Sequence, residues 1–316
     1  MSMKHKLPIF ILLMLILLGY LLYVPDIAVE ELKEKYCDDQ SQFMEIQGMQ
    51  VHYKVEGTGP PLVLIHGTAS SLHTWDSWTK HLIGNYKVIR MDIPAFGITG
   101  PNSGNDYSIN SYVNFIHEFL EILGEDTVSI AGNSLGGRIC WNYAKTYPDK
   151  ISKLILIDPS GLSMPNDPET SIGFKIAKTP ILNALFTRVT PKFLHRKSIL
   201  EVYADPNKVT DELVQRYYEL MLRPGNRKAF VERVKVEYKS NPSNLDQISS
   251  PTLILWGKQD RWIPYTHARE YQRLIPNTQV IVYENAGHVP MEEIPLKTVT
   301  DVISFLHKES VLVDTE

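Results

Sequence analysis

The chain has little cysteine and no concentration of positive charge, and each shortage narrows the class of protein that it can be. Its two cysteines, Cys37 and Cys140, belong to no C-x-x-C pair and lie near no cluster of histidines, so no metal site is indicated. We expect Cys140 to be a small core residue, with a disulfide to Cys37 as the weaker alternative. The net charge is −4, and basic residues form no run of five or more, so nucleic acid is not an expected partner.

Repeats and low-complexity tracts are also absent, and what remains is an alternation of apolar strands with helices. A predicted hairpin of residues 43–47 and 50–56 comes first. Strands are then expected at about 61–65, 87–91, 127–131, 151–157, 251–256 and 278–283, with helices at about 72–83, 108–123, 134–146, 266–275 and 296–308. This rhythm predicts one α/β domain with a mostly parallel, doubly wound sheet. Residues 162–245 interrupt it with helical patterns, so we predict an inserted helical cap on a core of residues 43–161 and 246–308.

The longest apolar run lies at the N-terminus. Residues 7–24 are 18 uncharged, mostly apolar residues, and as a helix they span about 27 Å, close to the hydrocarbon core of about 30 Å. Two lysines precede the run and three acidic residues follow it, namely Lys4, Lys6, Asp26, Glu30 and Glu31. The positive-inside rule then leaves the rest of the chain outside the cytoplasm. We predict a single-pass membrane anchor over residues 1–24 and a charged, partly helical linker over 25–42, with a cleaved secretory signal as the alternative.

One strand-to-helix turn carries the most specific chemical signal. An apolar strand runs into Gly-Asn-Ser-Leu-Gly at residues 132–136 and then into a helix. Gly-x-Ser-x-Gly in this setting is typical of a nucleophile elbow, in which Gly132 and Gly136 let the strand and helix approach while Ser134 is exposed. The N–H of Leu135 begins the helix and is free to bind an oxyanion. A glycine-rich turn without chemistry is the alternative, so the interpretation needs partner residues.

Two later segments supply those partners in the order expected of a parallel sheet. A buried strand near the C-terminus presents Asp260 after its end, and the loop after the last strand carries His288. A histidine in that loop can reach Ser134 over the sheet edge and keep its second nitrogen for Asp260. Asp158 is a less favoured acid, because Pro159 follows it directly and the cap departs from that point.

A third segment completes the expected oxyanion site. The strand at 61–65 is followed by His66, Gly67 and Thr68, and the Thr68 N–H is expected to face the same pocket as that of Leu135. Two N–H groups then converge on one developing negative charge. His66 itself is expected to hold this loop rather than to take part in the chemistry.

On these motifs the chain resembles the α/β-hydrolase superfamily over about residues 41–308. Further matching segments are residues 91–97, 256–260 and 287–295. Family members usually carry Gly where this chain has Ala95. The resemblance implies a nucleophile, an acid, a base and two oxyanion donors, which are Ser134, Asp260, His288, Thr68 and Leu135. Within this superfamily the chain is similar to membrane-anchored monoacylglycerol lipases and carboxylesterases, and to the C–C bond hydrolases of aromatic catabolism.

The predicted cap carries a hint about the substrate. Between residues 170 and 200 the chain has six basic residues and no acidic one, with apolar residues interleaved. The basic residues are Lys175, Lys178, Arg188, Lys192, Arg196 and Lys197. This composition suits a surface that lies against anionic headgroups and admits a lipid. In the alternative, the apolar residues pack on the core and the basic ones face water. Trp262 is expected either to line the pocket or to pack its loop.

The sequence thus predicts a membrane-anchored serine hydrolase that cleaves carboxylic esters with an apolar acyl chain through an acyl-enzyme, without a cofactor. The expected partners are a small-molecule or lipid ester and the membrane. One alternative is a C–C bond hydrolase, favoured by Asn133 and by cap cations able to bind a dicarboxylate, but those relatives often carry Trp where this chain has Val289. The other is a non-catalytic binding module, and the complete set of predicted site residues argues against it.

Overall fold

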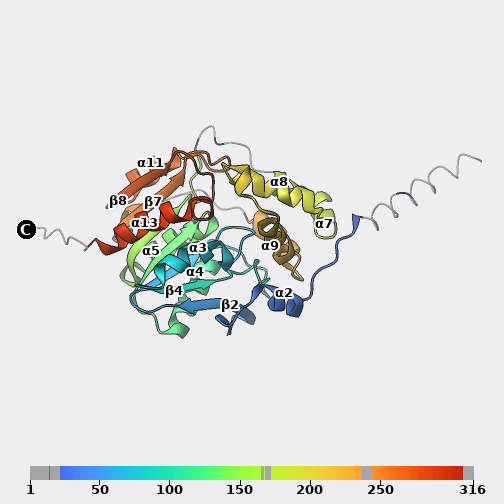
Figure 1. Cartoon of the computed structure of the whole chain (residues 1–316), viewed down its shortest axis with the longest axis horizontal. Coiled ribbons are helices and arrows are strands. Elements are labelled where there is room, and N and C mark those ends of the chain that lie inside the picture. Colours follow the sequence, from blue (N-terminus) through green and yellow to red (C-terminus); the bar gives the residue numbers. More distant parts are fainter. Residues whose placement is uncertain (1–13, 15–21, 165–166, 168–171, 237–242, 309–316) are drawn as a thin grey trace, which may run out of the picture.

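An eight-stranded sheet forms the centre of the computed structural model, which describes residues 14, 22–164, 167, 172–236 and 243–308. Its strand order is β1-β2-β4-β3-β5-β6-β7-β8 (Figure 1). The strands are β1 (Ser41–Ile46), β2 (Met49–Glu56), β3 (Pro61–Ile65), β4 (Lys87–Met91), β5 (Val128–Asn133), β6 (Ile151–Ile157), β7 (Thr252–Gly257) and β8 (Thr278–Tyr283). The β1–β2 and β2–β4 pairs are antiparallel and the remaining pairs are parallel. The loops after the parallel strands therefore meet at one edge of the sheet.

Helices cover both faces of the sheet, because the side chains of each buried strand alternate between two apolar cores. Along β3, Val63 and Ile65 belong to one core and Leu62 and Leu64 to the other. The first core contains side chains of α4 (Ile109–Leu123), α5 (Leu135–Thr146) and α11 (His267–Leu274). The second contains those of α3 (Asp76–Leu82), α12 (Pro290–Glu293) and α13 (Pro295–His307). The predicted mostly parallel, doubly wound sheet is confirmed.

Five described helices lie between β6 and β7 and form a layer beyond the carboxyl edge of the sheet (Figure 1). They are α6 (Ile172–Lys178), α7 (Leu182–Phe186), α8 (Lys192–Val202), α9 (Asp211–Met221) and α10 (Asn226–Lys235). We call this helical layer the cap. Its α8 ends against the loop after β8, where the His288 N–H donates to the Val202 carbonyl at 2.8 Å. The cap therefore contacts the same edge of the sheet at which the predicted site residues lie.

The N-terminal part differs in detail from the prediction. Strand β1 begins at Ser41 rather than at residue 43. The prediction missed its first two residues because they are polar and pair at the sheet edge, so they show no apolar alternation. Within the predicted linker, α2 (Val29–Tyr36) buries Leu32. The predicted membrane segment, residues 7–24, lies outside the described residues apart from Met14 and the stretch from Leu22 onward. No helix of the described part is long and apolar enough to cross a membrane.

Three other local features, a predicted helix, the two cysteines and Ala95, can be compared with the structure. The predicted helix over 72–83 is a short 3-10 turn, Leu72–Trp75, followed by α3. Both cysteines are free thiols, so the alternative disulfide is wrong, and Cys140 is buried as expected. Ala95, where the family usually has Gly, takes a φ of 85°, a left-handed conformation that explains the usual preference for glycine.

Candidate active site

Ser134 occupies a strained turn between β5 and α5. Its φ is 53° and its ψ is −112°, a conformation that non-glycine residues hold only where neighbouring groups enforce it. The Ser134 N–H donates to the Ile157 carbonyl at 3.0 Å, and its own carbonyl accepts the Arg138 N–H at 3.0 Å. A Cβ on Gly136 would lie 2.1 Å from the Ile65 carbonyl oxygen. The glycine thus permits the close crossing of helix and sheet that exposes Ser134.

His288 and Asp260 are hydrogen-bonded partners. The His288 Nδ1 lies 2.6 Å from Asp260 Oδ2, and the two side chains are 3% and 0% exposed. The other Asp260 oxygen accepts the N–H groups of Trp262 at 2.7 Å and Ile263 at 3.0 Å. Asn133, directly before the serine, donates to the His288 carbonyl at 2.9 Å. Backbone and side-chain bonds therefore fix the orientation of this acid and of the imidazole that it binds.

The three predicted triad residues come together at the carboxyl edge of the sheet. Ser134 and His288 line one cavity of about 80 Å³, and Asp260 binds the imidazole from behind. In such an arrangement the histidine can accept the serine proton, and the carboxylate can hold the tautomer and stabilise the imidazolium. Asp158, the less favoured acid, does not take this place: its Oδ1 accepts the Gly257 N–H at 3.0 Å.

The predicted oxyanion donors flank the serine. Thr68 lines the same cavity, and Leu135 is the first residue of α5, whose first-turn N–H groups lack intrahelical partners. Gly67 permits the approach, because a Cβ there would lie 3.2 Å from the Ser134 Cβ. His66 holds this loop as expected: its Nε2 accepts the Ile93 N–H at 3.1 Å, so its Nδ1 donates to the Gly67 carbonyl at 2.8 Å. Burial lowers the pKa of His66 and keeps the ring neutral.

A larger apolar cavity of about 320 Å³ adjoins the cavity at Ser134. Both are lined by Thr68, Ala69, His195, Ser198 and Trp262. The larger one continues between cap helices along Phe174, Ile176, Leu182, Leu185, Phe186 and Leu194. None of the described residues that line it carries a permanent charge. The pair of cavities can therefore hold an apolar group next to the serine hydroxyl.

Two further aromatic residues line the cavity at Ser134. The sequence left pocket lining and loop packing open for Trp262 and did not identify His195. The Trp262 ring centroid lies 5.4 Å from that of His288, so it lines the pocket and also packs the loop. His195 comes from α8, and burial lowers its pKa to about 4. The sequence signal for Trp262 was its position two residues after Asp260. No sequence signal marks His195, because its place depends on how the cap packs.

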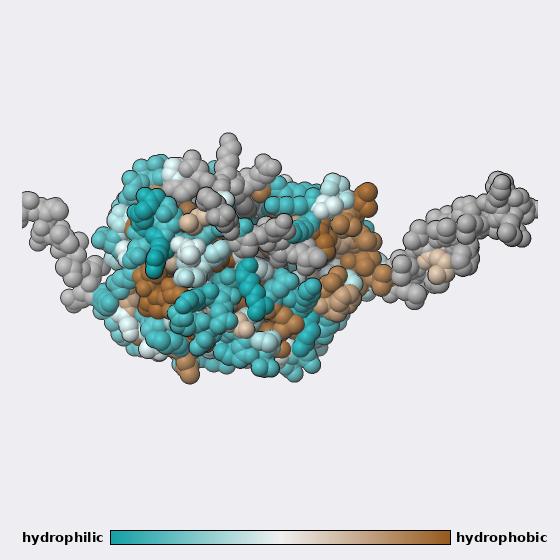
Figure 2. All heavy atoms as spheres, turned by 90° about the horizontal axis from the view of Figure 1, so that it is seen from above, coloured by the Kyte–Doolittle hydropathy of each residue, from teal (hydrophilic) through white to brown (hydrophobic). Residues whose placement is uncertain are grey.

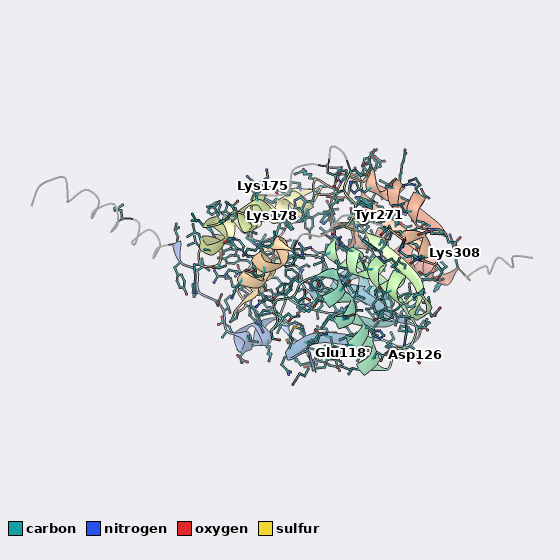
Figure 3. The ribbon with its side chains drawn as sticks, turned by 180° about the vertical axis from the view of Figure 1, so that it is seen from behind. Glu118, Asp126, Lys175, Lys178, Tyr271 and Lys308 are labelled. Carbon is teal, nitrogen blue, oxygen red and sulfur yellow. The ribbon has the colours of Figure 1, made fainter. Side chains whose placement is uncertain are left out.

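The apolar side chains of the cap divide between the core and the surface. Phe174 and Phe186 pack against the core, with ring centroids 5.8 and 5.7 Å from Phe230. Other apolar side chains are exposed, namely Ile181, Leu182, Leu185, Phe193 and Leu194. None of the six basic residues lines either cavity at the site. Figure 3 shows Lys175 and Lys178 at the outer edge of the cap, and both are exposed.

The chain is similar to several known hydrolases. The profile described as "alpha/beta hydrolase fold" matches residues 60–295. Monoacylglycerol lipase ABHD6 of Homo sapiens is 31% identical over 262 residues, which cover 79% of this chain and 76% of that protein. The 2-hydroxy-6-oxo-2,4-heptadienoate hydrolase of Pseudomonas putida is 28% identical over 252 residues, covering 76% and 87%.

Among solved structures, a membrane phospholipase A described as a bacterial virulence factor has a TM-score of 0.75 and 25% identity, and the match covers 96% of this chain and 98% of that one. The family profile spans most of the chain and both cores of the sheet. This chain is a member of the α/β hydrolase family.

Proposed function

We propose that this hydrolase cleaves carboxylic esters with an apolar acyl chain through an acyl-enzyme. Ser134 attacks the ester carbonyl, and His288 accepts its proton and then protonates the leaving alcohol. Asp260 holds the imidazole, and the N–H groups of Thr68 and Leu135 bind the oxyanion. Water then releases the acid and regenerates the serine. The chemistry needs no cofactor.

The uncharged lining of the 320 Å³ cavity is the observation that carries this proposal. An acyl chain placed there loses its contact with water without facing an unpaired charge, and its carbonyl can reach the cavity of Ser134 through the shared lining. The similarity to a monoacylglycerol lipase and to a membrane phospholipase A supports a lipid ester as the substrate.

A C–C bond hydrolase is the second candidate, and the relative from Pseudomonas putida favours it. The structure gives less support to the two sequence features that favoured this activity, namely Asn133 and the cations of the cap. Asn133 donates to the carbonyls of Ile157 and His288, at 3.2 and 2.9 Å, and so serves the backbone around the serine. The cap cations do not line the cavities, where a dicarboxylate needs a cation to pair with.

A substrate panel distinguishes the two activities. We expect p-nitrophenyl esters to be hydrolysed with kcat/KM rising from short to medium or long acyl chains, and a 2-hydroxy-6-oxo-dienoate to be cleaved far more slowly. A higher kcat/KM for the dienoate would reverse the assignment. A complete lack of turnover, with no labelling by a fluorophosphonate, would favour the non-catalytic module.

The membrane is the proposed location, and residues 1–24 the proposed single-pass anchor, with the hydrolase core and the cap of residues 162–245 outside the cytoplasm. The described chain that follows Leu22 contacts the cap. The Val24 N–H donates to the Arg188 carbonyl at 2.9 Å, and Asp26 Oδ1 lies 2.7 Å from Arg227 Nη2. At this end Ile181 is 84% and Phe193 69% exposed. Figure 2 shows hydrophobic residues gathered where the N-terminal chain departs.

A lipid surface suits this arrangement. An exposed apolar patch next to a membrane anchor can enter the headgroup region, and the surrounding cations can pair with anionic lipids. The apolar cavity is lined partly by Leu182, Leu185 and Leu194, which also belong to the exposed patch. The patch therefore offers a lipid a route from the bilayer toward Ser134.

A further inference from the structure

A second carboxyl group lies behind the candidate triad. Asp158 follows β6 and is completely buried, with a φ of 42°. Asp158, Asp260 and His288 each offer a nitrogen or oxygen atom within 4.8 Å of the others. Asp158 Oδ1 accepts the Gly257 N–H at 3.0 Å, whereas Oδ2 accepts no hydrogen bond from a donor group of the described residues. The Asp260 carboxyl lies within hydrogen-bonding reach of Asp158. Two buried carboxyls thus share one small space with a single imidazole.

The surroundings of the two carboxyls decide which one carries the negative charge. Asp260 accepts three N–H groups, from His288, Trp262 and Ile263, and such donors stabilise an ionised carboxylate. Asp158 accepts one. Two buried carboxylates this close cannot both ionise without strong repulsion. Burial and the neighbouring Asp260 accordingly raise the pKa of Asp158 well above its ordinary value.

Other titratable groups around Asp158 do not supply a counter-charge. Glu293 adds negative charge and accepts the N–H groups of Gly287, Ala204 and Asp205. The Tyr283 hydroxyl, on β8, donates to Asp301 at 2.9 Å. No lysine or arginine among the described residues forms an ion pair with Asp158. The position of the proton follows: Oδ1 is the acceptor for Gly257, so Oδ2 is the oxygen that carries the hydrogen.

We propose that Asp158 is a protonated carboxyl whose Oδ2–H donates to the Asp260 carboxylate and so positions the acid of the triad. Asp158 is a positioning residue and does not touch the substrate. Its hydrogen bond holds Asp260 against His288 while the pair carries only one negative charge. The inference rests on the proposed function, in which Asp260 serves His288. The strained φ of Asp158 fits this role, since such strain persists where the surroundings enforce it.

Two nearly isosteric variants test the proposal. Asp158→Asn keeps a donor toward Asp260 and is neutral, so we expect kcat within about threefold of wild type and an unchanged acidic limb in the pH profile of kcat/KM, which reports the base of the free enzyme. Asp158→Leu removes the donor. We expect it to lower kcat about 10- to 100-fold with little change in KM, the range of a hydrogen bond to a charged group.

Infrared difference spectroscopy tests the proton without relying on turnover. At neutral pH, wild type minus Asp158→Asn should show the carbonyl band of a protonated carboxylic acid. The lack of this band would overturn the proposal, as would a downward shift of the acidic limb by about one unit in Asp158→Asn, since that shift would show that the substitution removes a negative charge beside the base. Equal kcat in the Asn and Leu variants would also overturn it. If no variant or wild type turns over esters, the proposed function fails while the infrared band still tests the proton.

Discussion

Replacing Asp260 by Asn changes the protonation of the candidate base in a direction that the hydrogen bonds determine. Asp260 Oδ1 accepts two backbone N–H groups, from Trp262 and Ile263, so the amide oxygen of Asn must remain on that side. The amide NH₂ then faces His288 Nδ1, which lies 2.6 Å from the present Oδ2. A donor at this point makes Nδ1 an acceptor and moves the ring proton to Nε2. That nitrogen can no longer take the proton of Ser134.

The expected loss is large because the wrong tautomer cannot act as a base. Loss of the orienting carboxylate is expected to lower kcat by on the order of 10⁴, which corresponds to about 5 kcal/mol in the activation barrier. The assay is steady-state hydrolysis of a p-nitrophenyl ester, with circular dichroism to show that the fold is kept. Asp158→Asn is the matched control and is expected to stay near wild type. A larger loss at Asp158 than at Asp260 would place the acid after β6 and refute the reasoning.

Further predictions concern the membrane, pH and the elbow. Full-length protein should stay in the membrane fraction after carbonate or high-salt washing, because screening of charge does not release a buried apolar helix. Recovery of a chain that lacks residues 1–28 would contradict the proposed anchor. Protein truncated to begin at residue 25, which keeps α2, should bind anionic vesicles with an affinity that falls as the salt concentration rises. Changing three cap lysines to Gln should weaken this vesicle binding by about 1 kcal/mol for each charge at the surface. The three are Lys175, Lys178 and Lys192. Binding that is insensitive to salt would exclude the cap from lipid contact. Burial alone lowers the pKa of His52, but the Asp92 carboxylate at 2.9 Å outweighs it and raises the pKa to about 9. The stability that this pair contributes is present below pH 6.5 and lost as the pH rises through about 9, so the urea-unfolding free energy should fall by on the order of 3 kcal/mol over that window in wild type but not in His52→Gln. Gly136→Ala should yield little folded protein, since its Cβ would lie 2.1 Å from a backbone oxygen; normal yield and activity would show that the elbow relaxes.

Much of the site follows from the sequence because its residues sit at the ends of regular elements. Ser134 and Asp260 come after apolar strands, and in a parallel sheet those ends must meet at one edge. His288 follows the last strand, so its place was also predictable. The glycines of the elbow mark a close crossing that only the smallest residue permits, and this is a local property of the chain.

The residues that the sequence could not place owe their positions to packing between distant segments. Asp158, which the sequence named only as a less favoured acid, lies beside Asp260 because β6 and β7 are neighbours, and its protonation depends on burial that no pattern reveals. His195 reaches the site only through the packing of α8 in the cap. The cap sequence likewise did not show that Phe186 faces the core while Leu185, its neighbour, is exposed, because short helices with apolar residues on several sides have no single predicted face.

Active-site labelling tests the central proposal most directly. Full-length protein is treated with a fluorophosphonate and the modified peptide is identified by mass spectrometry, alongside ester turnover by Ser134→Ala. We predict a single modified residue, Ser134, slower labelling in His288→Gln, and a loss of turnover of at least about 10⁴-fold in Ser134→Ala, since only oxyanion stabilisation and binding remain. Labelling at another residue, or comparable ester hydrolysis by Ser134→Ala, would contradict the assignment of Ser134 as the nucleophile.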